Sequence, residues 1–592
     1  MEMQEFYTGR AFDAHHFFGA HAYFGGVHFA VWAPAAQRVQ VQLDMGCWDL
    51  HRTHAGVWEC DVQDAQPGMV YQYLVTGANG QTVCHCDPYG FAMTLRPDGR
   101  SIVVGQLPAF TDDAWMAQRD RNFNKPLSIY EVHAGSWRRK PDGSWYTYTE
   151  LAELLPAYCK EHGYTHLELM PLAEHPFDGS WGYQTTAFFA PTSRYGTPAE
   201  LVQFVDACHA AGIGVILDFV PVHFAVDDYG LKQFDGTALY EYPAAAVGES
   251  EWGSCNFMHS RGEIRCFVQS CAAYWLETFH ADGLRMDAVS RLIYWQGDPA
   301  RGVNGSTLDF LKQMNAGLHA RFPSAMLIAE DSTNFPKVTA PVEYGGLGFD
   351  YKWDLGWMND TLNFFRTPPA ERPDHFGKLT FSMMYAWNEH YLMPLSHDEN
   401  VHGKATIAQK MYGDYEAKFP QARALYLYMA IHPGKTLDFM GNEFAQLREF
   451  DEGREQDWLL LQYPLHDGFL AYRTALNKLV LEQGAFWQRE YDPAAFHWMD
   501  CAHPELRACA MWRQGEQDAV FALFNFGDTP LQGYTVPVEA PGSVTLLLDS
   551  DWQCWGGTTP RPAQCTAQPV QTSLTVDLAP YSGQLFRFVP GA

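Results

Sequence analysis

TPAELVQFVDACHAAGIGVILDFV, residues 197–220, reads as one helix followed by one strand. Thr197 can cap a helix that has Pro198 at its first position, and apolar residues recur along one side of the predicted helix. A glycine at 212 ends it, and the run Gly214–Val220 is almost continuously apolar. Such a run is typical of a parallel strand that is buried on both faces.

The same alternation of amphipathic helix and apolar strand continues in both directions along the chain. Eight strands are expected, at residues 128–133, 166–172, 214–220, 283–289, 326–331, 349–354, 392–398 and 437–443. Eight such units fit a closed (β/α)₈ barrel, with its longest insertion at about 221–264, after the third strand. A doubly wound open sheet is the structural alternative.

Both ends of the chain carry β patterns instead. Arg38–Leu43 alternates with period two, and Ala519–Phe526 is a further strand followed by a Gly-Asp turn. We therefore expect an α/β chain in three parts: a β-sandwich at 1–110, the central (β/α)₈ TIM barrel at 111–486, and a second β-sandwich at 487–592. Residues 111–126 are expected to form an irregular linker.

Composition excludes several classes of function. The chain has 592 residues and a formal net charge of −29, so nucleic acid and anionic lipid are poor partners, whereas a neutral ligand is compatible with this charge. There are 13 cysteines but no CxxC pair, and Cys84-His85-Cys86 lacks a second pair at zinc-like spacing. No signal peptide and no run of about 18 apolar residues is present. These features predict a cytoplasmic protein, which we expect to be a monomer.

Polar residues gather where the predicted strands end, which is where barrels of this kind place their active sites. The residues are Asp218 and His223, Arg285 and Asp287, Glu330 and Asp331, and His397 and Asp398. Buried carboxylates are costly unless they are paired, so three or more at one edge indicate a function. Two chemistries fit them: a divalent metal site, for which residues 397–402 could form a loop, or glycosyl transfer. The phosphate-loop-like Pro433–Thr436 is rejected because Met429 replaces the first glycine.

The segments at these strand ends resemble the four short conserved segments of glycoside hydrolase family 13, the α-amylase superfamily. They are DFVPVH at 218–223, GLRMDAV at 283–289, IAED at 328–331 and LSHDE at 395–399. Further segments resemble the 1,4-α-glucan branching enzymes, among them EVHAGSW at 131–137, WGYQ at 181–184 and GLGFDYKW at 346–353. The region WAP at 32–34 is similar to the N-terminal carbohydrate-binding sandwich of these enzymes, so the resemblance implies a carbohydrate-binding module at 1–110 and a catalytic barrel at 111–486. Val222 departs from the family pattern, where glycine is usual, and Asp354 stands where asparagine is common.

The resemblance implies a role for each matched residue. Asp287 would be the nucleophile, Glu330 the general acid/base and Asp398 the third carboxylate, in a retaining site whose two reacting carboxyls lie roughly 5–5.5 Å apart. The implied substrate-binding residues are Tyr183, Asp218, His223, Arg285, His397 and Trp181. The implied substrate is an α-glucan polysaccharide (glycogen, amylose or amylopectin), with no cofactor and no metal.

Three other functions share parts of this pattern. A trehalose-releasing or debranching hydrolase uses the same carboxylates and differs in its products. A glucan-binding protein without activity would keep the aromatic residues but lose a carboxylate, and all three are present. A metal-dependent phosphate enzyme would be inactivated by a chelator, and we expect no such loss.

Overall fold

The computed structural model describes residues 1–591, which form two compact units. The first unit comprises Met1–Asp120, His133–Pro156 and Glu168–Asp350, and the second comprises Arg121–Val132, Ala157–Leu167 and the chain from Tyr351 onward. This division cuts across the predicted domains, so the domain bounds at 110 and 486 remain predictions. None of the helices in the described residues is long and apolar enough to cross a membrane.

Eight strands form a closed barrel, which confirms the predicted fold class. In chain order they are β10 (Ser128–Val132), β11 (His166–Leu169), β14 (Gly214–Phe219), β17 (Gly283–Met286), β18 (Met326–Ala329), β19 (Tyr351–Trp353), β20 (Tyr391–Leu395) and β21 (Lys435–Phe439). All residues of β10, β11, β14, β17, β18 and β19 are buried, as expected for strands that are covered on both faces.

The last strand begins two residues earlier than predicted and stops at Phe439. Gly434 (φ 123°) and Gly441 (φ 94°) flank it in the left-handed region, and a 3₁₀ turn, Asn442–Phe444, follows. The sequence LDFMGNE, predicted to be a strand throughout, is therefore half strand and half turn, because glycine permits the chain to reverse there.

Helices separate most of the barrel strands, and a further helix follows the last strand, as the apolar periodicity predicts; between β18 and β19 lies only a 3₁₀ turn, Val342–Tyr344. The longer ones are α4 (Tyr148–Glu161), α5 (Pro198–Ala211), α7 (Gly262–Thr278), α9 (Gly305–Arg321), α10 (Leu355–Arg366), α14 (Tyr415–Ile431) and α15 (Pro464–Glu482). The helix predicted at 197–211 is confirmed: Thr197 and Glu200 form a reciprocal capping box, and Gly212 ends the helix in the left-handed region (φ 82°).

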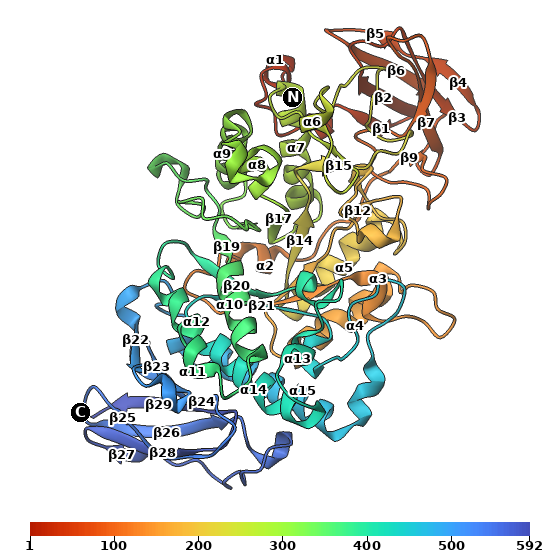
Figure 1. Cartoon of the computed structure of the whole chain (residues 1–592). Helices are drawn as coiled ribbons and strands as arrows, with labels where there is room; N and C mark the ends of the chain where they lie inside the picture. The colour runs from red at the N-terminus through yellow and green to blue at the C-terminus, as the bar shows by residue number, and fades with distance from the viewer. Residues whose placement is uncertain (592) are drawn as a thin grey trace. The chain divides into compact units, whose positions relative to one another are not determined.

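The N-terminal part consists of two antiparallel sheets (Figure 1). One has the order β1 (Gly19–Tyr23), β2 (Gly26–Trp32), β6 (Val57–Gln63), β5 (His51–Arg52), and the other β4 (Gly46–Asp49), β3 (Arg38–Leu43), β7 (Val70–Thr76), β8 (Thr82–His85), with β9 (Ser101–Ile102) on β7. In β3 the residues Val39, Val41 and Leu43 are buried, while Arg38 and Gln42 are exposed. The period-two pattern thus corresponds to one core-facing side, which confirms the predicted sandwich.

The segment expected to be an irregular linker contains a helix, α2 (Asp113–Gln118). None of its residues is fully buried, so it lacks the apolar stripe by which a helix is found in a sequence. A distant contact fixes it: the Trp115 indole N–H donates to Asp282 Oδ1 at 2.8 Å.

The insertion after β14 folds back as a small two-stranded ladder. β15 (His223–Phe224) pairs with β16 (Cys255–Asn256), and a short helix, α6 (Ala245–Gly248), lies between them in the chain.

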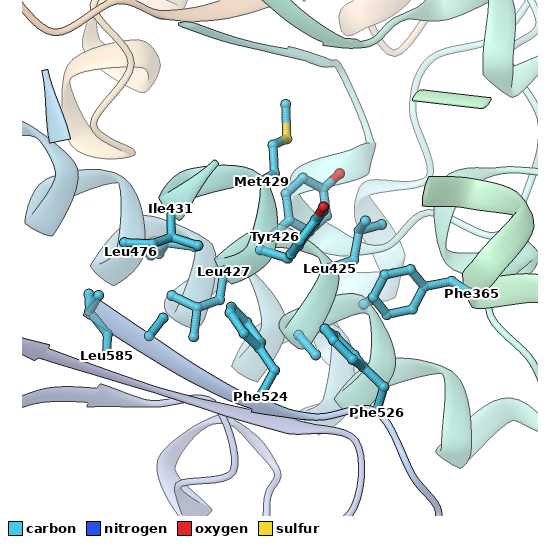
Figure 2. Packing of buried hydrophobic residues seen from close by; sticks show 14 of the residues in the cluster. Phe365, Leu425, Tyr426, Leu427, Met429, Ile431, Leu476, Phe524, Phe526 and Leu585 are labelled. Atoms are coloured by element: carbon cyan, nitrogen blue, oxygen red, sulfur yellow. The ribbon is translucent and has the colours of Figure 1, made fainter. Parts of the chain in front are cut away.

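The second unit ends in two antiparallel sheets. The larger has the order β22 (Phe496–Asp500), β23 (Ala508–Gln514), β24 (Ala519–Asn525), β29 (Ser582–Pro590), β26 (Gly542–Asp549), β27 (Gln568–Val570), and β25 (Leu531–Pro537) pairs with β28 (Ser573–Leu578). Figure 2 shows Leu427 of α14 beside Phe524 of β24, with Phe526 and Phe365 close together. A shared apolar core therefore joins these strands to the helices of the second unit.

Candidate active site

Three neighbouring strands of the first unit bring four of the predicted site residues together. In the register of β14 and β17, Asp218 lies opposite Arg285. Met286 lies opposite Ala329 on β17 and β18, so Asp287 and Glu330 are the next residues on two adjacent strands. Adjacent strands are roughly 4.8 Å apart, so two carboxylates stand side by side at these strand ends.

The guanidinium of Arg285 connects the acidic side chains. Its Nη1 lies 2.7 and 2.9 Å from the two carboxylate oxygens of Asp218 and 3.0 Å from Asp287 Oδ1. Its Nη2 lies 3.5 Å from Glu330 Oε2. A planar guanidinium presents several N–H donors in fixed directions, so one buried cation can orient three carboxylates at once.

Exposure separates these side chains into two pairs. The side chains of Asp218 and Arg285 are 1% exposed, whereas those of Asp287 and Glu330 are 15% and 17% exposed. The buried pair can therefore serve as a support. The other two carboxylates are accessible enough to meet a substrate.

Glu330 is also held by the main chain. The backbone N–H of Ala288 donates to Glu330 Oε2 at 2.7 Å. Ala288 has φ 49°, in the left-handed region that L-residues rarely adopt. This conformation directs the amide after Asp287 towards the neighbouring carboxylate.

Tyr183 joins the group through a loop that glycine makes possible. Its hydroxyl donates to Asp218 Oδ2 at 2.5 Å. Gly182 has φ 94°, and a Cβ there would lie 2.4 Å from the carbonyl oxygen of Pro171, so no other residue fits. Burial raises the pKa of Asp218 to about 6, although Arg285 opposes the shift, so this carboxyl is ionised at neutral pH. Trp181, predicted with Tyr183, is half-buried two residues earlier.

His223 is buried in β15 beside an aromatic ring that the sequence did not single out. Its ring centroid lies 5.1 Å from that of Trp252. Burial lowers the pKa of His223 to about 3, so the imidazole is neutral at physiological pH. Its Nδ1 is buried and has no hydrogen-bond partner within residues 1–591.

The remaining two predicted residues belong to the second unit and follow β20, in the 3₁₀ turn His397–Asn400. His397 Nδ1 lies 2.5 Å from Glu131 Oε1, and its backbone N–H donates to Glu131 Oε2 at 2.8 Å. The Asp398 side chain is 53% exposed, with Oδ1 3.6 Å from His397 Nε2. The predictions gave Glu131 no role; the signal was a carboxylate inside the otherwise apolar run SIYEV of β10.

The strand-end carboxylates differ from the one group in the described chain that has metal-ligand spacing. His15, His16 and Glu277 place one ligand atom each within 4.8 Å of one another, and none of them is a predicted site residue. The arrangement around Arg285 instead places two accessible carboxylates together, as glycosyl transfer requires.

Family models match three parts of the chain. Residues 17–90 match carbohydrate-binding module 48, described as the isoamylase N-terminal domain. Residues 151–235 match the catalytic domain of alpha amylase, and residues 498–589 match its C-terminal all-beta domain. These matches define the class, an α-amylase-type enzyme with a carbohydrate-binding module.

Relatives of known description extend over most of the sequence. The 1,4-alpha-glucan branching enzyme GlgB of Thiobacillus denitrificans is 43% identical over 584 residues, which cover 94% of this chain and 79% of that relative. The enzyme of the same description from Geobacillus stearothermophilus is 41% identical over 573 residues, covering 94% and 90%. A solved pullulanase type I of Bacillus subtilis shares the fold, with a TM-score of 0.75 at 18% identity, covering 97% of this chain and 85% of that one. The chain belongs to the family of 1,4-alpha-glucan branching enzymes.

Proposed function

We propose that this protein breaks α-1,4 bonds of glycogen, amylose or amylopectin and transfers the released segment to a 6-hydroxyl, forming α-1,6 branches. The observation that carries the proposal is the contact of one buried guanidinium, that of Arg285, with the two accessible carboxylates of Asp287 and Glu330. A retaining glycosyl transfer needs such a pair, one carboxylate to attack and one carboxylic acid to protonate.

In the first step, Asp287 attacks the anomeric carbon while Glu330 donates its proton to the departing glycosidic oxygen. The α-1,4 bond breaks, its electron pair goes to that oxygen, and an ester joins the sugar to Asp287. In the second step, Glu330 takes the proton of an acceptor 6-hydroxyl, whose oxygen attacks the same carbon and releases Asp287. The configuration is retained because the carbon is inverted twice.

The other predicted residues are proposed to support this exchange. Asp398 follows β20 of the same closed barrel and would hold sugar hydroxyls together with His397. His223, neutral at physiological pH, can accept or donate one hydrogen bond to a hydroxyl.

Three further proposed roles concern side chains of the first unit. Tyr183 and Trp181 would stack against sugar rings, whose apolar faces suit flat aromatic groups. Asp218 would fix Arg285, which is bound to it through both carboxylate oxygens.

We also propose that the protein acts in the cytoplasm as a single chain. All thirteen cysteines are free, although several are exposed, as a reducing compartment allows.

The test is the product formed from amylose. A branching enzyme lowers the iodine colour and forms α-1,6 links with little new reducing sugar, because each broken bond is replaced by another. Reducing ends that rise in step with chain cleavage would instead identify a hydrolase, such as a debranching or trehalose-releasing enzyme. Debranching of the product, followed by chain sizing, gives the length of the transferred segment.

A further inference from the structure

The loop that follows Asp398 is held by two lysines of the second unit. Lys410, the last residue of α13 (Ile407–Lys410), donates from Nζ to the carbonyl oxygens of Glu399 and Ala405, the latter at 2.6 Å. Lys404 donates from Nζ to the carbonyl oxygen of Asp398 at 2.8 Å. The carbonyl oxygens of Asp398 and Glu399 therefore each accept a hydrogen bond from a lysine ammonium group.

The carboxylate of Glu399 neutralises both lysines. Its Oε1 lies 3.2 Å from Lys404 Nζ and its Oε2 lies 3.7 Å from Lys410 Nζ. The Lys410 side chain is 1% exposed and that of Glu399 is 15% exposed. Burial lowers the pKa of Lys410 to about 8, with Glu399 opposing the shift. A buried ammonium is costly, and an apolar residue of similar size would serve packing alone, so its presence calls for a reason.

The loop itself needs external support. His402, Gly403 and Ala405 all have positive φ, at 57°, 77° and 68°. The backbone N–H groups of Gly403 and Ala405 donate to the carboxylate of Glu449 at 3.0 and 2.7 Å. Left-handed residues so close together are unfavourable unless the surroundings hold them. Of the carbonyls that Lys410 binds, one belongs to Ala405, the last of these residues, and the other to Glu399, three residues before the first.

We propose that Lys410 is a positioning residue for the transfer reaction: by binding the carbonyls of Glu399 and Ala405 it fixes the backbone that aims the Asp398 carboxylate. This inference rests on the proposed role of Asp398. The direction of a side chain depends on the φ and ψ angles of its own residue and of the next one. The orientations of the Asp398 and Glu399 carbonyls depend on the same angles, and Lys404 and Lys410 hold these two carbonyls in place.

The test compares five variants with amylose as substrate. Lys410→Met is expected to lower kcat roughly ten- to a hundredfold, the effect of losing the one charge-assisted hydrogen bond to the Glu399 carbonyl next to Asp398, with KM within about twofold of wild type. Lys410→Arg, which keeps the charge and two donors, should recover most of kcat. Lys418→Met is the matched control: Lys418 binds the carbonyls of Gln409 and Met411, outside the Asp398 loop, and its loss should leave kcat unchanged.

The outcomes separate this inference from the proposed function. Lys410→Met with kcat within about threefold of wild type overturns it, and so does an equal loss in Lys418→Met. Where Lys410→Met does not fold, the half-exposed Lys404→Met, which removes the donor to Asp398, decides: unchanged kcat overturns the inference. Asp398→Asn tests the proposed function alone. Full activity of this variant would exclude the proposed role of the Asp398 carboxylate, whatever the result for Lys410→Met.

Discussion

Replacing Arg285 by lysine tests whether the guanidinium organises the site or merely balances charge. Lysine retains one positive charge on a side chain of similar length. It presents a single nitrogen, however, whereas Arg285 reaches Asp218 and Asp287 from Nη1 and Glu330 from Nη2. An ammonium in this position can satisfy one or two of the three carboxylates, so the alignment of Asp287 relative to Glu330 is lost.

The expected fall in activity follows from the hydrogen bonds that lysine cannot make. Two charge-assisted hydrogen bonds, at about 1.5–2 kcal/mol each, correspond to roughly 3–4 kcal/mol, or two to three orders of magnitude in kcat/KM. Stability should fall as well, because Asp218 is 1% exposed and keeps fewer partners.

The assay is the fall of iodine–amylose absorbance, measured at equal concentrations of folded protein. Arg513→Lys is the control, since Arg513 is also 1% exposed and pairs with a buried carboxylate, Glu490, at 3.1 Å in the second unit. The control should unfold at a lower temperature while its kcat/KM stays at the wild-type value. Activity of Arg285→Lys within about tenfold of wild type would refute the organising role.

Four further experiments have defined outcomes. Asp287→Ala should lower transfer by roughly 10⁴ or more while the circular dichroism spectrum stays native, and near-normal activity would exclude Asp287 as the nucleophile. Thr197→Ala should destabilise the protein by about 1 kcal/mol in thermal unfolding through loss of the capping box, with kcat unchanged; an unaltered unfolding temperature would contradict this. Burial lowers the pKa of His432 to about 4, so on acidification the unfolded chain takes up a proton before the folded one does. Between pH 6.5 and 5.5 His432 should therefore lower the free energy of unfolding by roughly 1 kcal/mol. Calorimetry should show a smaller acid destabilisation for His432→Gln than for wild type, and equal losses of stability in the two proteins would refute this prediction. Activity should survive a chelator, and its loss would favour the metal-dependent alternative.

The barrel could be predicted because its strands leave a strong pattern. A run such as GVILDF, with a polar residue near its end and a glycine before it, identifies both the strand and the position of a functional side chain. The charged residues of the site stand at such ends. Arg285, Asp287 and Glu330 could therefore be grouped with one rule, that the active sites of such barrels lie at the carboxyl ends of the strands.

Features that depend on tertiary contact could not be predicted. The helix α2 has no apolar stripe and is fixed through Trp115 and Asp282, far apart in the sequence. Glu131 lies within β10, where its carboxylate looks like an exception, and only its contacts with His397 explain it. Trp252 lies in an insertion without regular periodicity, so nothing in the sequence connects it with His223.

The backbone of Ala288 has a consequence for engineering. An L-residue held with φ 49° costs roughly 1–2 kcal/mol relative to an ordinary conformation, and glycine would escape most of that cost. Selection for heat resistance would thus favour glycine at 288, and a freer peptide there would let the amide turn away from Glu330. Variants selected for thermostability alone, without measurement of kcat, would therefore tend to acquire glycine at 288 and lose activity.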